Sequence, residues 1–494
     1  MAGTSAQRDA APAGQRGGLA ANVLGLWDGI VLGFASAAPG VSIAGVLGGL
    51  AGASGHGALL ALLIGFVPLV FIACSFFHLN RWRADVGISY AWIGRILHPI
   101  IGGFVGILII IAFVVSNSFA IIPAASNFLT VFSTSASNNK WLVTIVGTIF
   151  LIAITVAVVS GIRLAARFQW VLTTFEMIVL LVFAIWALHR GLHGHASGVA
   201  GTAVPSLSWF SFSSAGGGTG LLAGLLISVF WYSGWETAVV VNEETRRARR
   251  NPGLAGIGSL IAVLVVSLLF SLLFFAAVSP HVMSGNSAWL ADLGIQLAGK
   301  PWGYLLVLGI MAGYLGGIET TIITFGNVGY SMGRDGVLWR AFGKVSSRTE
   351  MPWLAIVVLS VPSFLMFVVQ VWTGGTLASI IADLASSLGE MFVVYYALTG
   401  ITSAWLLRGV ARHRPGIAIT GVLLPLLGAA FLLWIGWKSW GETNSAVKTT
   451  FLIAIVASAV LIVISRLRGK AAFFSVRQSG PVTAEELAGA DSSA

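Results

Sequence analysis

The first long apolar run of the chain is interrupted at mid-span by the sequence Gly33-Phe34-Ala35-Ser36-Ala37-Ala38-Pro39-Gly40-Val41-Ser42. Proline lacks a backbone N–H and glycine accepts non-helical dihedral angles, so a helix through this run is expected to break here. A later apolar run is interrupted in the same way by Tyr232-Ser233-Gly234-Trp235-Glu236. For either segment alone, a simple kink remains the alternative. Two breaks at matching places predict a binding site built from broken helices.

Apolar runs recur along all 494 residues, which are 57% hydrophobic and only 9% charged. So little charge does not cover the surface of a soluble protein. About 20 apolar residues at 1.5 Å per residue span a hydrocarbon core of roughly 30 Å. The run lengths therefore predict an all-α membrane protein with twelve transmembrane helices, because a β-barrel would show shorter alternating segments. The runs are 27–51, 57–78, 100–131, 141–160, 165–188, 220–242, 253–279, 302–330, 352–371, 377–407, 416–437 and 449–466.

The positive charges follow the predicted topology. With the N-terminus in the cytoplasm and the runs alternating in direction, few of the 27 lysines and arginines fall on the outer side: Lys140, Arg190, Lys300, Lys438 and Lys448. This positive-inside bias predicts a multi-pass protein with both termini cytoplasmic. The net charge of +10 therefore indicates topology and no nucleic-acid partner. The richness in Ala, Gly, Val and Leu suggests a bacterial source and hence the bacterial plasma (inner) membrane.

The organisation along the chain follows from the same runs. Residues 1–20 are expected to form a disordered cytoplasmic tail, and 21–407 a ten-helix core. The core would contain two repeats, at about 21–190 and 215–407, each beginning with a broken helix. Residues 408–470 would form helices 11 and 12, and 471–494 a second cytoplasmic tail, expected to be disordered from Ser475. The chain has one cysteine, Cys74, so no intramolecular disulfide is possible.

Three motifs resemble one transporter family. The segments Asn242-Glu243-Glu244-Thr245-Arg246 and Arg250-Asn251-Pro252 are similar to its Glu-Glu-Thr stretch after helix 6, with Ala248 where proline often stands. Gly87-Ile88-Ser89-Tyr90-Ala91-Trp92 resembles its re-entrant loop between helices 2 and 3. Tyr330-Ser331-Met332-Gly333-Arg334-Asp335-Gly336 resembles the inner end of its helix 8. In this order the motifs make the chain similar to the amino acid–polyamine–organocation (APC) superfamily.

The resemblance implies a LeuT-like fold of two inverted five-helix repeats with broken helices 1 and 6, and alternating access around a substrate between them. The expected function is secondary active transport, as a proton-coupled symporter or exchanger that imports an amino acid, with no enzyme activity and no cofactor. A polyamine or amine permease and a potassium transporter on the same fold remain alternatives, as does coupling to sodium.

Two departures from the family pattern bear on this expectation. Residues 36–40 replace a Gly-x-Gly run that binds an α-carboxylate in many amino acid members, which keeps amine substrates open. Asn327 stands where many relatives have an arginine in helix 8.

The candidate substrate-binding residues surround the two breaks and one polar position of the third run. Freed backbone groups need partners in hydrocarbon, and a bound solute can supply them. Aromatic side chains near the second break could contact an amine through a cation–π interaction, or could simply pack the core. Asn117, between two serines, could line the site or bond neighbouring helices. The set is Ser36, Ala37, Ala38, Pro39, Gly40, Ser42, Asn117, Phe230, Trp231, Ser233, Gly234, Trp235 and Glu236.

Carboxylates at membrane depth are candidates for coupling, because burial disfavours the ionised form and makes such a group a reversible proton carrier. The six acids at this depth are Asp28, Glu176, Glu236, Glu319, Asp383 and Glu390. We expect Glu176, Glu236 and Glu319 to serve in coupling, Asp28 to lie at the inner interface, and the last two to line the outer vestibule or serve a structural role. Helix packing is the alternative for each coupling acid.

Spacing from the nearest inner arginine estimates the depth of two of these acids. Glu176 follows Arg167 by nine residues, about 13 Å, which places it near the midplane. There it matches a helix 5 position where some proton-coupled relatives carry a lysine that faces helices 1 and 8. Glu319 precedes Arg334 by fifteen residues, about 22 Å, which predicts a position in the outer half.

Two further clusters carry weaker signals. His189, His193 and His195 lie in an outer loop without the closed ligand set that a zinc site needs, so we expect no metal. The charge run from Glu243 to Arg250 is expected either to form salt bridges at an inner gate or to solvate a loop.

Overall fold

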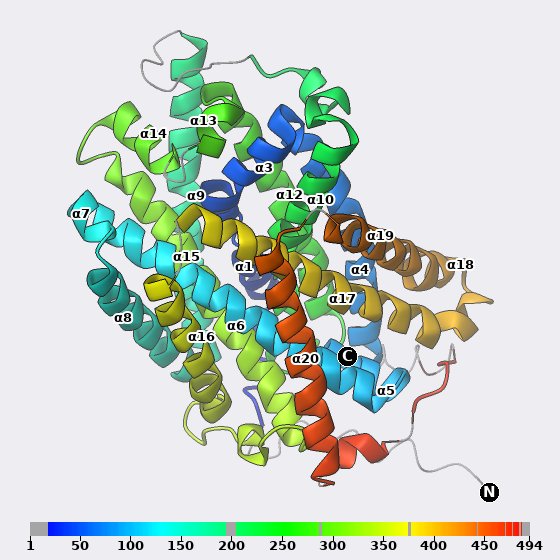
Figure 1. The fold of residues 1–494 in the computed structure, drawn as a ribbon. Helices are drawn as coiled ribbons and strands as arrows, with labels where there is room; N and C mark the ends of the chain where they lie inside the picture. Colours follow the sequence, from blue (N-terminus) through cyan, green and yellow to red (C-terminus); the bar gives the residue numbers. More distant parts are fainter. Residues whose placement is uncertain are drawn as a thin grey trace, which may run out of the picture.

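The computed structural model describes residues 18–193, 204–285, 289–373, 377–441, 443–469, 471–476, 478–483 and 486. These residues form a helical bundle whose only β pairing is an isolated bridge between Leu24 and Thr245 (Figure 1). Within them, eleven helical segments are long and apolar enough to cross a membrane. The all-α membrane class expected from the sequence is therefore confirmed.

The first of these segments covers two of the runs predicted from the sequence. It extends from Leu26 to Trp82, and its 57 residues would reach about 85 Å as one straight helix, far more than a single crossing needs. The expected count of twelve crossings stays a prediction. The segment is divided into α1 (Leu26–Ala37), α2 (Pro39–Val41), a π-helical turn (Ser42–Val46), α3 (Leu47–Ser54), a 3-10 turn (Gly55–Gly57) and α4 (Ala58–Trp82).

The remaining long helices agree with the predicted runs to within about one helical turn at most ends. Their N-termini often carry the expected caps; for example, the side chain of Asn139 accepts hydrogen bonds from two N–H groups at the start of α8. They are α6 (Pro99–Thr130), α8 (Lys140–Val159), α9 (Ile162–Leu192), α10 (Gly217–Tyr232), α12 (Asn251–Ala277), α15 (Tyr304–Arg334), α16 (Trp353–Thr373), α17 (Leu377–Ala411), α19 (Leu424–Trp440) and α20 (Ser445–Leu467).

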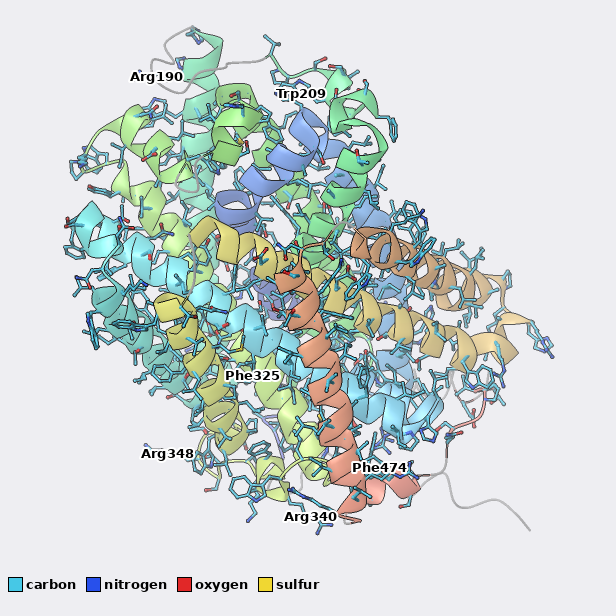
Figure 2. All side chains as sticks on the ribbon, viewed as in Figure 1. Arg190, Trp209, Phe325, Arg340, Arg348 and Phe474 are labelled. Carbon is cyan, nitrogen blue, oxygen red and sulfur yellow. The ribbon has the colours of Figure 1, made fainter. Side chains whose placement is uncertain are left out.

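Short helices connect the long ones, and one of them belongs to the second break. One end carries α5, and we call it the α5 end; the opposite end, which carries α13 and α14, is the α13 end (Figure 1). Figure 2 places Arg340, Arg348 and Phe474 at the α5 end and Arg190 at the α13 end. The short helices are α5 (Ser89–Ile96), α7 (Thr134–Ser137), α11 (Thr237–Val240), α13 (Pro280–Gly285), α14 (Trp289–Ala298) and α18 (Pro415–Ile417), with 3-10 turns at 207–210, 213–215, 242–244, 340–343 and 472–475 and a π-helical turn at 418–423.

Both helix breaks expected from the sequence are present, and they lie against each other. α1 ends where Ala38 adopts a left-handed conformation, with φ 45° and ψ 59°, and Pro39 begins the next helical turn. In the second break Gly234 has φ 101°, and a Cβ there would lie 2.6 Å from the carbonyl oxygen of Ser36. Gly40, which we expected to supply the unusual dihedral angle, is instead helical.

The described residues of both predicted tails contact the bundle. Leu19, within the predicted N-terminal tail, is buried in a cluster with Val86 and Tyr330. Residues 1–17 lie outside the described residues.

The C-terminal segment also contacts the bundle. The ring of Phe473 stacks on that of Tyr90 in α5, with their centroids 4.6 Å apart, and fills the space beside Gly94. The N–H of Ser479 donates to the carbonyl oxygen of Arg95 at 2.7 Å. The described part of this tail therefore covers α5.

We predict that Gly234→Ala destabilises the protein by at least roughly 1–2 kcal/mol, because an L-residue at this φ is strained and its Cβ meets the backbone of Ser36. Thermal unfolding of the purified protein in detergent measures the change. Gly49→Ala is the matched control, since a Cβ at this exposed helical position meets nothing within 4 Å. Equal stability of the two variants would mean that the second break is not a rigid feature.

Candidate functional site

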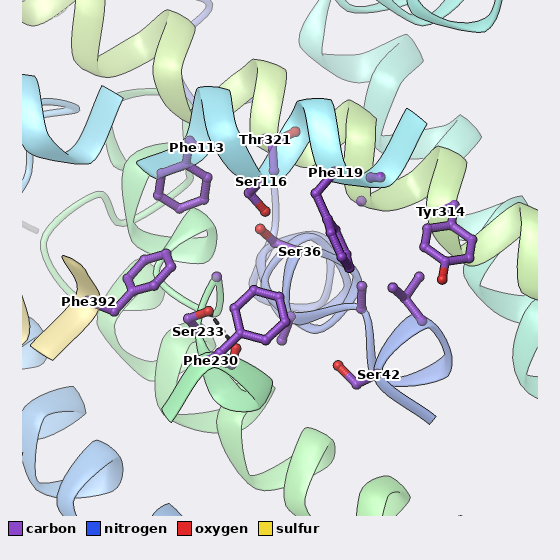
Figure 3. A pocket seen from close by; sticks show the side chains of 16 residues that line it. Ser36, Ser42, Phe113, Ser116, Phe119, Phe230, Ser233, Tyr314, Thr321 and Phe392 are labelled. Atoms are coloured by element: carbon purple, nitrogen blue, oxygen red, sulfur yellow. Dashed lines mark hydrogen bonds between the residues drawn. The ribbon is translucent and has the colours of Figure 1, made fainter. Parts of the chain in front are cut away.

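A small cavity lies where the two helix breaks meet (Figure 3). Its volume is about 40 Å³. Small-molecule sites usually enclose roughly 300 Å³ or more, so the lining side chains must move before an organic solute can bind. The lining residues come from α1 and α2 with the turn after them, α6, the end of α10, α15 and α17: Ser36, Ala37, Ala38, Val41, Ser42, Phe113, Ser116, Phe119, Ala120, Phe230, Ser233, Gly234, Tyr314, Gly317, Thr321 and Phe392.

The residues that we expected to bind substrate divide into two groups. One group lines the cavity and consists of Ser36, Ala37, Ala38, Ser42, Phe230, Ser233 and Gly234. The other group is not part of the lining and consists of Pro39, Gly40, Asn117, Trp231, Trp235 and Glu236.

The two tryptophans near the second break are fully buried in packing contacts. The indole N–H of Trp231 donates to the hydroxyl of Ser267 in α12 at 2.7 Å. Trp235 packs edge-to-face on Phe76 of α4, with ring centroids 4.9 Å apart. Both side chains thus lie on the side of the second break that faces α4 and α12. This position agrees with the alternative that these aromatic residues pack the core.

Glu236 holds the second break together. Its Oε2 accepts a hydrogen bond from the N–H of Gly234 at 3.0 Å and another from the hydroxyl of Tyr396 in α17 at 2.7 Å. A helix break leaves backbone N–H groups without helical partners, and this carboxylate satisfies one of them. The position of Glu236 therefore favours maintenance of the broken helix over direct contact with a solute.

A chain of hydroxyl groups joins the first break to α11 and α15. The hydroxyl of Thr237 lies 2.8 Å from that of Ser36 and 2.7 Å from that of Thr324. Ser36 also lines the cavity. A change in its hydrogen bond to Thr237 would therefore alter a contact between the two broken helices.

Several lining residues were not singled out from the sequence. Phe113, Phe119 and Phe392 come from α6 and α17, and Tyr314 and Thr321 come from α15. Phe113, Ser116 and Ala120 are spaced three and four residues apart and therefore lie on one face of α6. The sequence does not show which helix this face contacts, so these residues could not be assigned to the cavity.

The chemistry of the cavity is neutral. Among the described lining residues none is charged; four are phenylalanines, and hydroxyl groups come from Ser36, Ser42, Ser116, Ser233, Tyr314 and Thr321. Figure 3 shows the rings of Phe113, Phe119, Phe230 and Phe392 around the hydroxyl groups of Ser36 and Ser116. Such a lining suits a solute with an apolar part and polar groups bound by hydroxyls and backbone.

Glu176 lies behind the first break. Its carboxylate packs against Gly40 of α2 and Gly313 of α15, where any Cβ would overlap it. The side chain is buried, and its Oε1 has no hydrogen-bond partner among the described residues. The two glycines therefore leave room for one carboxyl group between three helices. An ionised carboxylate there would lack a compensating partner, so the uncharged form is favoured.

Glu319 is linked to the helix that carries Glu176. With the side-chain amide of Gln169 oriented to satisfy both of its groups, its nitrogen donates to Glu319 Oε2 at 3.0 Å and its oxygen accepts from the hydroxyl of Thr173 at 2.9 Å. Gln169, Thr173 and Glu176 follow one face of α9. The two acids are thus the ends of a line of polar side chains.

The depths estimated for Glu176 and Glu319 are in the wrong order relative to each other. Glu319 lies six residues, about 9 Å, beyond Gly313 along α15 toward the α5 end, so it lies closer to that end than Glu176 does. The predicted order requires Arg334 to lie at the membrane surface. Arg334 instead bonds to Asp85 and Glu243, whose segments cover the end of α15.

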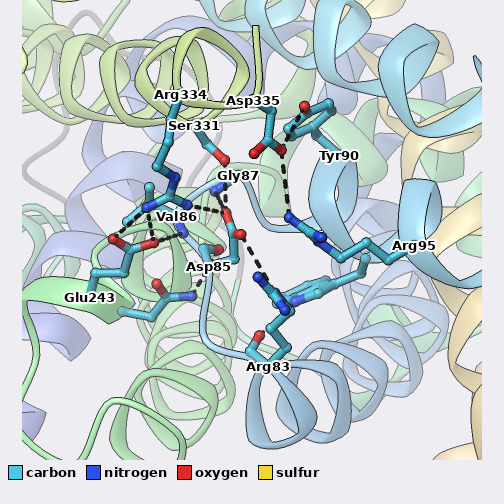
Figure 4. A network of polar contacts seen from close by, with 12 residues as sticks. Arg83, Asp85, Val86, Gly87, Tyr90, Arg95, Glu243, Ser331, Arg334 and Asp335 are labelled. Atoms are coloured by element: carbon cyan, nitrogen blue, oxygen red, sulfur yellow. Dashed lines mark hydrogen bonds and ion pairs between the residues drawn. The ribbon is translucent and has the colours of Figure 1, made fainter. Parts of the chain in front are cut away.

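A network of ion pairs closes the α5 end of the bundle (Figure 4). Arg334 lies 3.1 Å from Asp85 and 3.0 Å from Glu243, and so joins α15 to the loop before α5 and to the segment after α11. Burial by itself would raise the pKa of Asp85, but the guanidinium groups of Arg334 and Arg83 outweigh it and hold the pKa below its ordinary value. Asp85 is therefore ionised in this conformation.

A second part of the network holds α5 itself. The hydroxyl of Tyr90 donates to Asp335 Oδ2 at 3.0 Å, and Arg95 lies 3.7 Å from the same oxygen (Figure 4). Within the charge run that begins at Glu243, the contacts of Glu243 agree with the expected salt bridges.

The sequence reasoning missed Glu244 as a buried acid. Its side chain is fully buried beyond the apolar spans, and Oε2 accepts a hydrogen bond from Asn327 Nδ2 at 3.1 Å. Burial raises the pKa of Glu244 to about 8, with the neighbouring Glu243 adding to the rise and Asn327 opposing it. The sequence offered one indication, because Asn327 stands where many relatives have an arginine. Its contact with Glu244 could not be known from the sequence.

Three other acids lie apart from the cavity. Asp28 Oδ1 accepts the indole N–H of Trp170 at 3.0 Å, and Asp383 Oδ1 accepts from Asn444 at 2.6 Å. Glu390 is buried and lies beside Gly436 of α19.

Two members of the histidine cluster stack on each other. His189 and His193 stack with ring centroids 4.3 Å apart, and His195 lies outside the described residues. In the part of the chain that the structure describes, no group of three or more His, Cys, Asp or Glu side chains could hold a metal ion.

Comparison with known proteins gives a family and distant relatives. A model of the family described as "Amino acid permease" matches residues 24–465. The vacuolar cationic amino acid transporter 4 of Arabidopsis thaliana is 27% identical over 219 residues, which cover 43% of this chain and 34% of that protein. The branched-chain amino acid permease BcaP of Lactococcus lactis is 22% identical over 352 residues, which cover 66% of this chain and 72% of that protein. The chain therefore matches about a third of the length of the Arabidopsis relative.

We predict that Glu244→Gln removes a pH dependence of stability between about pH 5 and pH 8. A raised pKa means that the folded state holds a proton that the unfolded state has released above about pH 4.3. The stability contributed by this group is complete below that pH and is lost as the pH rises toward 8. The slope is at most about 1.4 kcal/mol per pH unit.

The measurement is the difference in unfolding midpoint between the unmodified chain and the variant across this range, so that contributions of the other acids cancel. Glu350→Gln, in an exposed loop, is the control and should follow the unmodified chain. Parallel curves for all three proteins would contradict a buried, protonated Glu244.

Proposed function

The chain belongs to the amino acid permease family, a member of the APC superfamily, and on this basis we propose that it is a proton-coupled secondary transporter that imports a neutral amino acid. The observation that carries the substrate class is the lining of the cavity between the two breaks: hydroxyl groups, backbone and four phenylalanine rings, with no charged side chain among its described residues.

The neutral lining distinguishes between the candidate substrates. A polyamine or a cationic amino acid brings one or more positive charges that need carboxylates when removed from water. Glu176 and Glu236 are the nearest candidates, but Glu236 is engaged by Gly234 and Tyr396, and neither acid lines the cavity. A zwitterion with an apolar side chain is the better match, with its polar ends bound by the hydroxyls and by backbone groups at the breaks.

Glu176 and Glu319 would carry the coupling proton. Glu176 fills the space between α2, α9 and α15, where movement of the first break would change its surroundings. The polar line through Thr173 and Gln169 offers a route from Glu176 to Glu319 and so toward the α5 end. Protonation of Glu176 would favour the loaded, closed state, and release of the proton would lower substrate affinity. Gly40 and Gly313 leave no room for a larger ligand set, which favours a proton over sodium.

The α5 end would be the cytoplasmic gate. The orientation follows from the positive-inside bias, with both termini cytoplasmic and the chain in a bacterial plasma membrane. The ion pairs of Arg334 close this end in the present conformation, and their separation would open a path from the cavity. Twelve crossings, with two inverted repeats that each begin with a broken helix, complete this proposal.

Uptake in proteoliposomes tests the substrate class. We expect an imposed inward proton gradient to drive accumulation of a radiolabelled neutral amino acid with an apolar side chain, and not of spermidine, arginine or potassium. The panel includes each of these solutes with proton, sodium and no gradient. Accumulation of the polyamine in place of the neutral amino acid would overturn the assignment.

Glu176→Gln tests the coupling residue. The amide has nearly the same shape but carries no titratable proton, so proton-driven accumulation should fall at least about tenfold, while exchange of internal for external substrate persists. Glu390→Gln is the matched control, since this acid is also buried but lies against α19. Full proton-driven accumulation by Glu176→Gln would eliminate Glu176 as the coupling group.

A further inference from the structure

A second cavity, of about 380 Å³, lies at the α5 end between the entrance to α1 and the first turns of α9. Its lining includes Asp28 of α1, Arg163 and Arg167 of α9, and Arg246 from the segment after α11. Three guanidinium groups therefore share one cavity with a single carboxylate.

The carboxylate does not neutralise these arginines. Asp28 Oδ2 accepts the N–H of Gly25 at 2.8 Å, and Oδ1 accepts the indole N–H of Trp170 at 3.0 Å. Arg246 Nε donates to a backbone carbonyl, that of Asn22, at 3.3 Å. Within the described chain, no ion pair joins any of the three arginines to an acid. The cavity thus has an excess of positive charge and suits an anion.

The surroundings of the cavity are those of a membrane interface. On α9, beside the two arginines, Leu164 and Val171 are 52% and 66% exposed and present an apolar face to the lipid. Trp27 and Trp170 lie on α1 and α9 with 68% and 40% of their surfaces exposed. Tryptophan is enriched at the level of the lipid headgroups, and an acyl chain could follow this face of α9 while its phosphate reaches the arginines.

We propose that this cavity binds the phosphate of an anionic phospholipid. Arg163 and Arg167 would hold the phosphate from α9, and Arg246 would hold it from the opposite wall. A soluble phosphate offers the same oxygens, but only a lipid also uses the exposed apolar face of α9.

Occupancy would link two parts of the transporter. The N–H of Arg246 donates to the carbonyl oxygen of Leu24 at 2.8 Å, and the N–H of Leu24 donates to the carbonyl oxygen of Glu244 at 3.0 Å. A phosphate that bridges Arg246 to α9 would therefore tie the start of α1 and the segment after α11 to α9. Since these segments adjoin the ion-paired gate, the lipid should stabilise the conformation in which the α5 end is closed.

The main alternative is that these arginines only set the orientation of the chain in the membrane. A matched control separates the two. Arg163→Gln/Arg167→Gln removes two charges from the cavity, and Arg412→Gln/Arg414→Gln removes two charges from an exposed segment after α17 that does not line it. Both variants change the net charge equally.

The experiment measures the unfolding midpoint of the purified full chain during titration with phosphatidylglycerol, with phosphatidylcholine and inorganic phosphate as separate arms. We expect phosphatidylglycerol to stabilise the unmodified chain and the control. The cavity variant should need a roughly tenfold higher concentration for the same shift, as expected for the loss of guanidinium contacts at a membrane surface. Equal responses of the two variants would overturn the proposal. Equal protection by inorganic phosphate would replace the lipid with a soluble anion and overturn the assignment.

If the cavity variant does not fold, native mass spectrometry of the unmodified chain decides. From an equal mixture of the two lipids, the protein should retain phosphatidylglycerol in preference to phosphatidylcholine, and equal retention would refute the site. No transport assay is involved, so this result is independent of the substrate and of the coupling ion.

Discussion

The structure depends on the rule that backbone polar groups in hydrocarbon must be paired within the protein. An unbroken helix meets this requirement by itself, but α1 ends at Ala37 and α10 ends before Gly234, so both breaks need other partners. One of these partners is a side chain of the protein: Glu236 accepts a hydrogen bond from the N–H of Gly234. The side-chain hydroxyl group of Thr237 also joins Ser36 of the first break to Thr324 of α15. Each break supports the other, because Gly234 lies directly against the carbonyl group of Ser36.

This arrangement places unlike chemistry on the two sides of the first break. One side carries the neutral, phenylalanine-rich cavity, and the other carries Glu176 between Gly40 and Gly313. Tyr314 lines the cavity directly after Gly313 in the chain, so α15 contacts both sides. A small movement of the break could thus alter a solute's contacts and an acid's surroundings together, which is what coupling between the two would need.

Much of the fold could be predicted from the sequence, because hydrocarbon imposes a minimum length on each apolar helix and proline and glycine mark the breaks. The cavity was harder to predict. The residues near the breaks were identified by proximity, but Phe113 and Phe392 come from helices whose rotation the sequence does not specify. The order of Glu176 and Glu319 along the bundle could not be predicted from spacing, because Arg334, from which the depth of Glu319 was counted, is held by Asp85 and Glu243 from other segments. Glu244 was overlooked because its burial depends on segments far apart in the chain.

The C-terminal segment described above has a practical consequence for anyone who engineers this protein. Phe473 stacks on Tyr90, whose hydroxyl is bonded to Asp335, and Ser479 is bonded to the backbone of Arg95. The described C-terminal segment is therefore attached to α5. A fluorescent protein or affinity tag fused directly after this segment would therefore lie beside α5, and a dye placed near Phe473 would report whether the segment stays on α5.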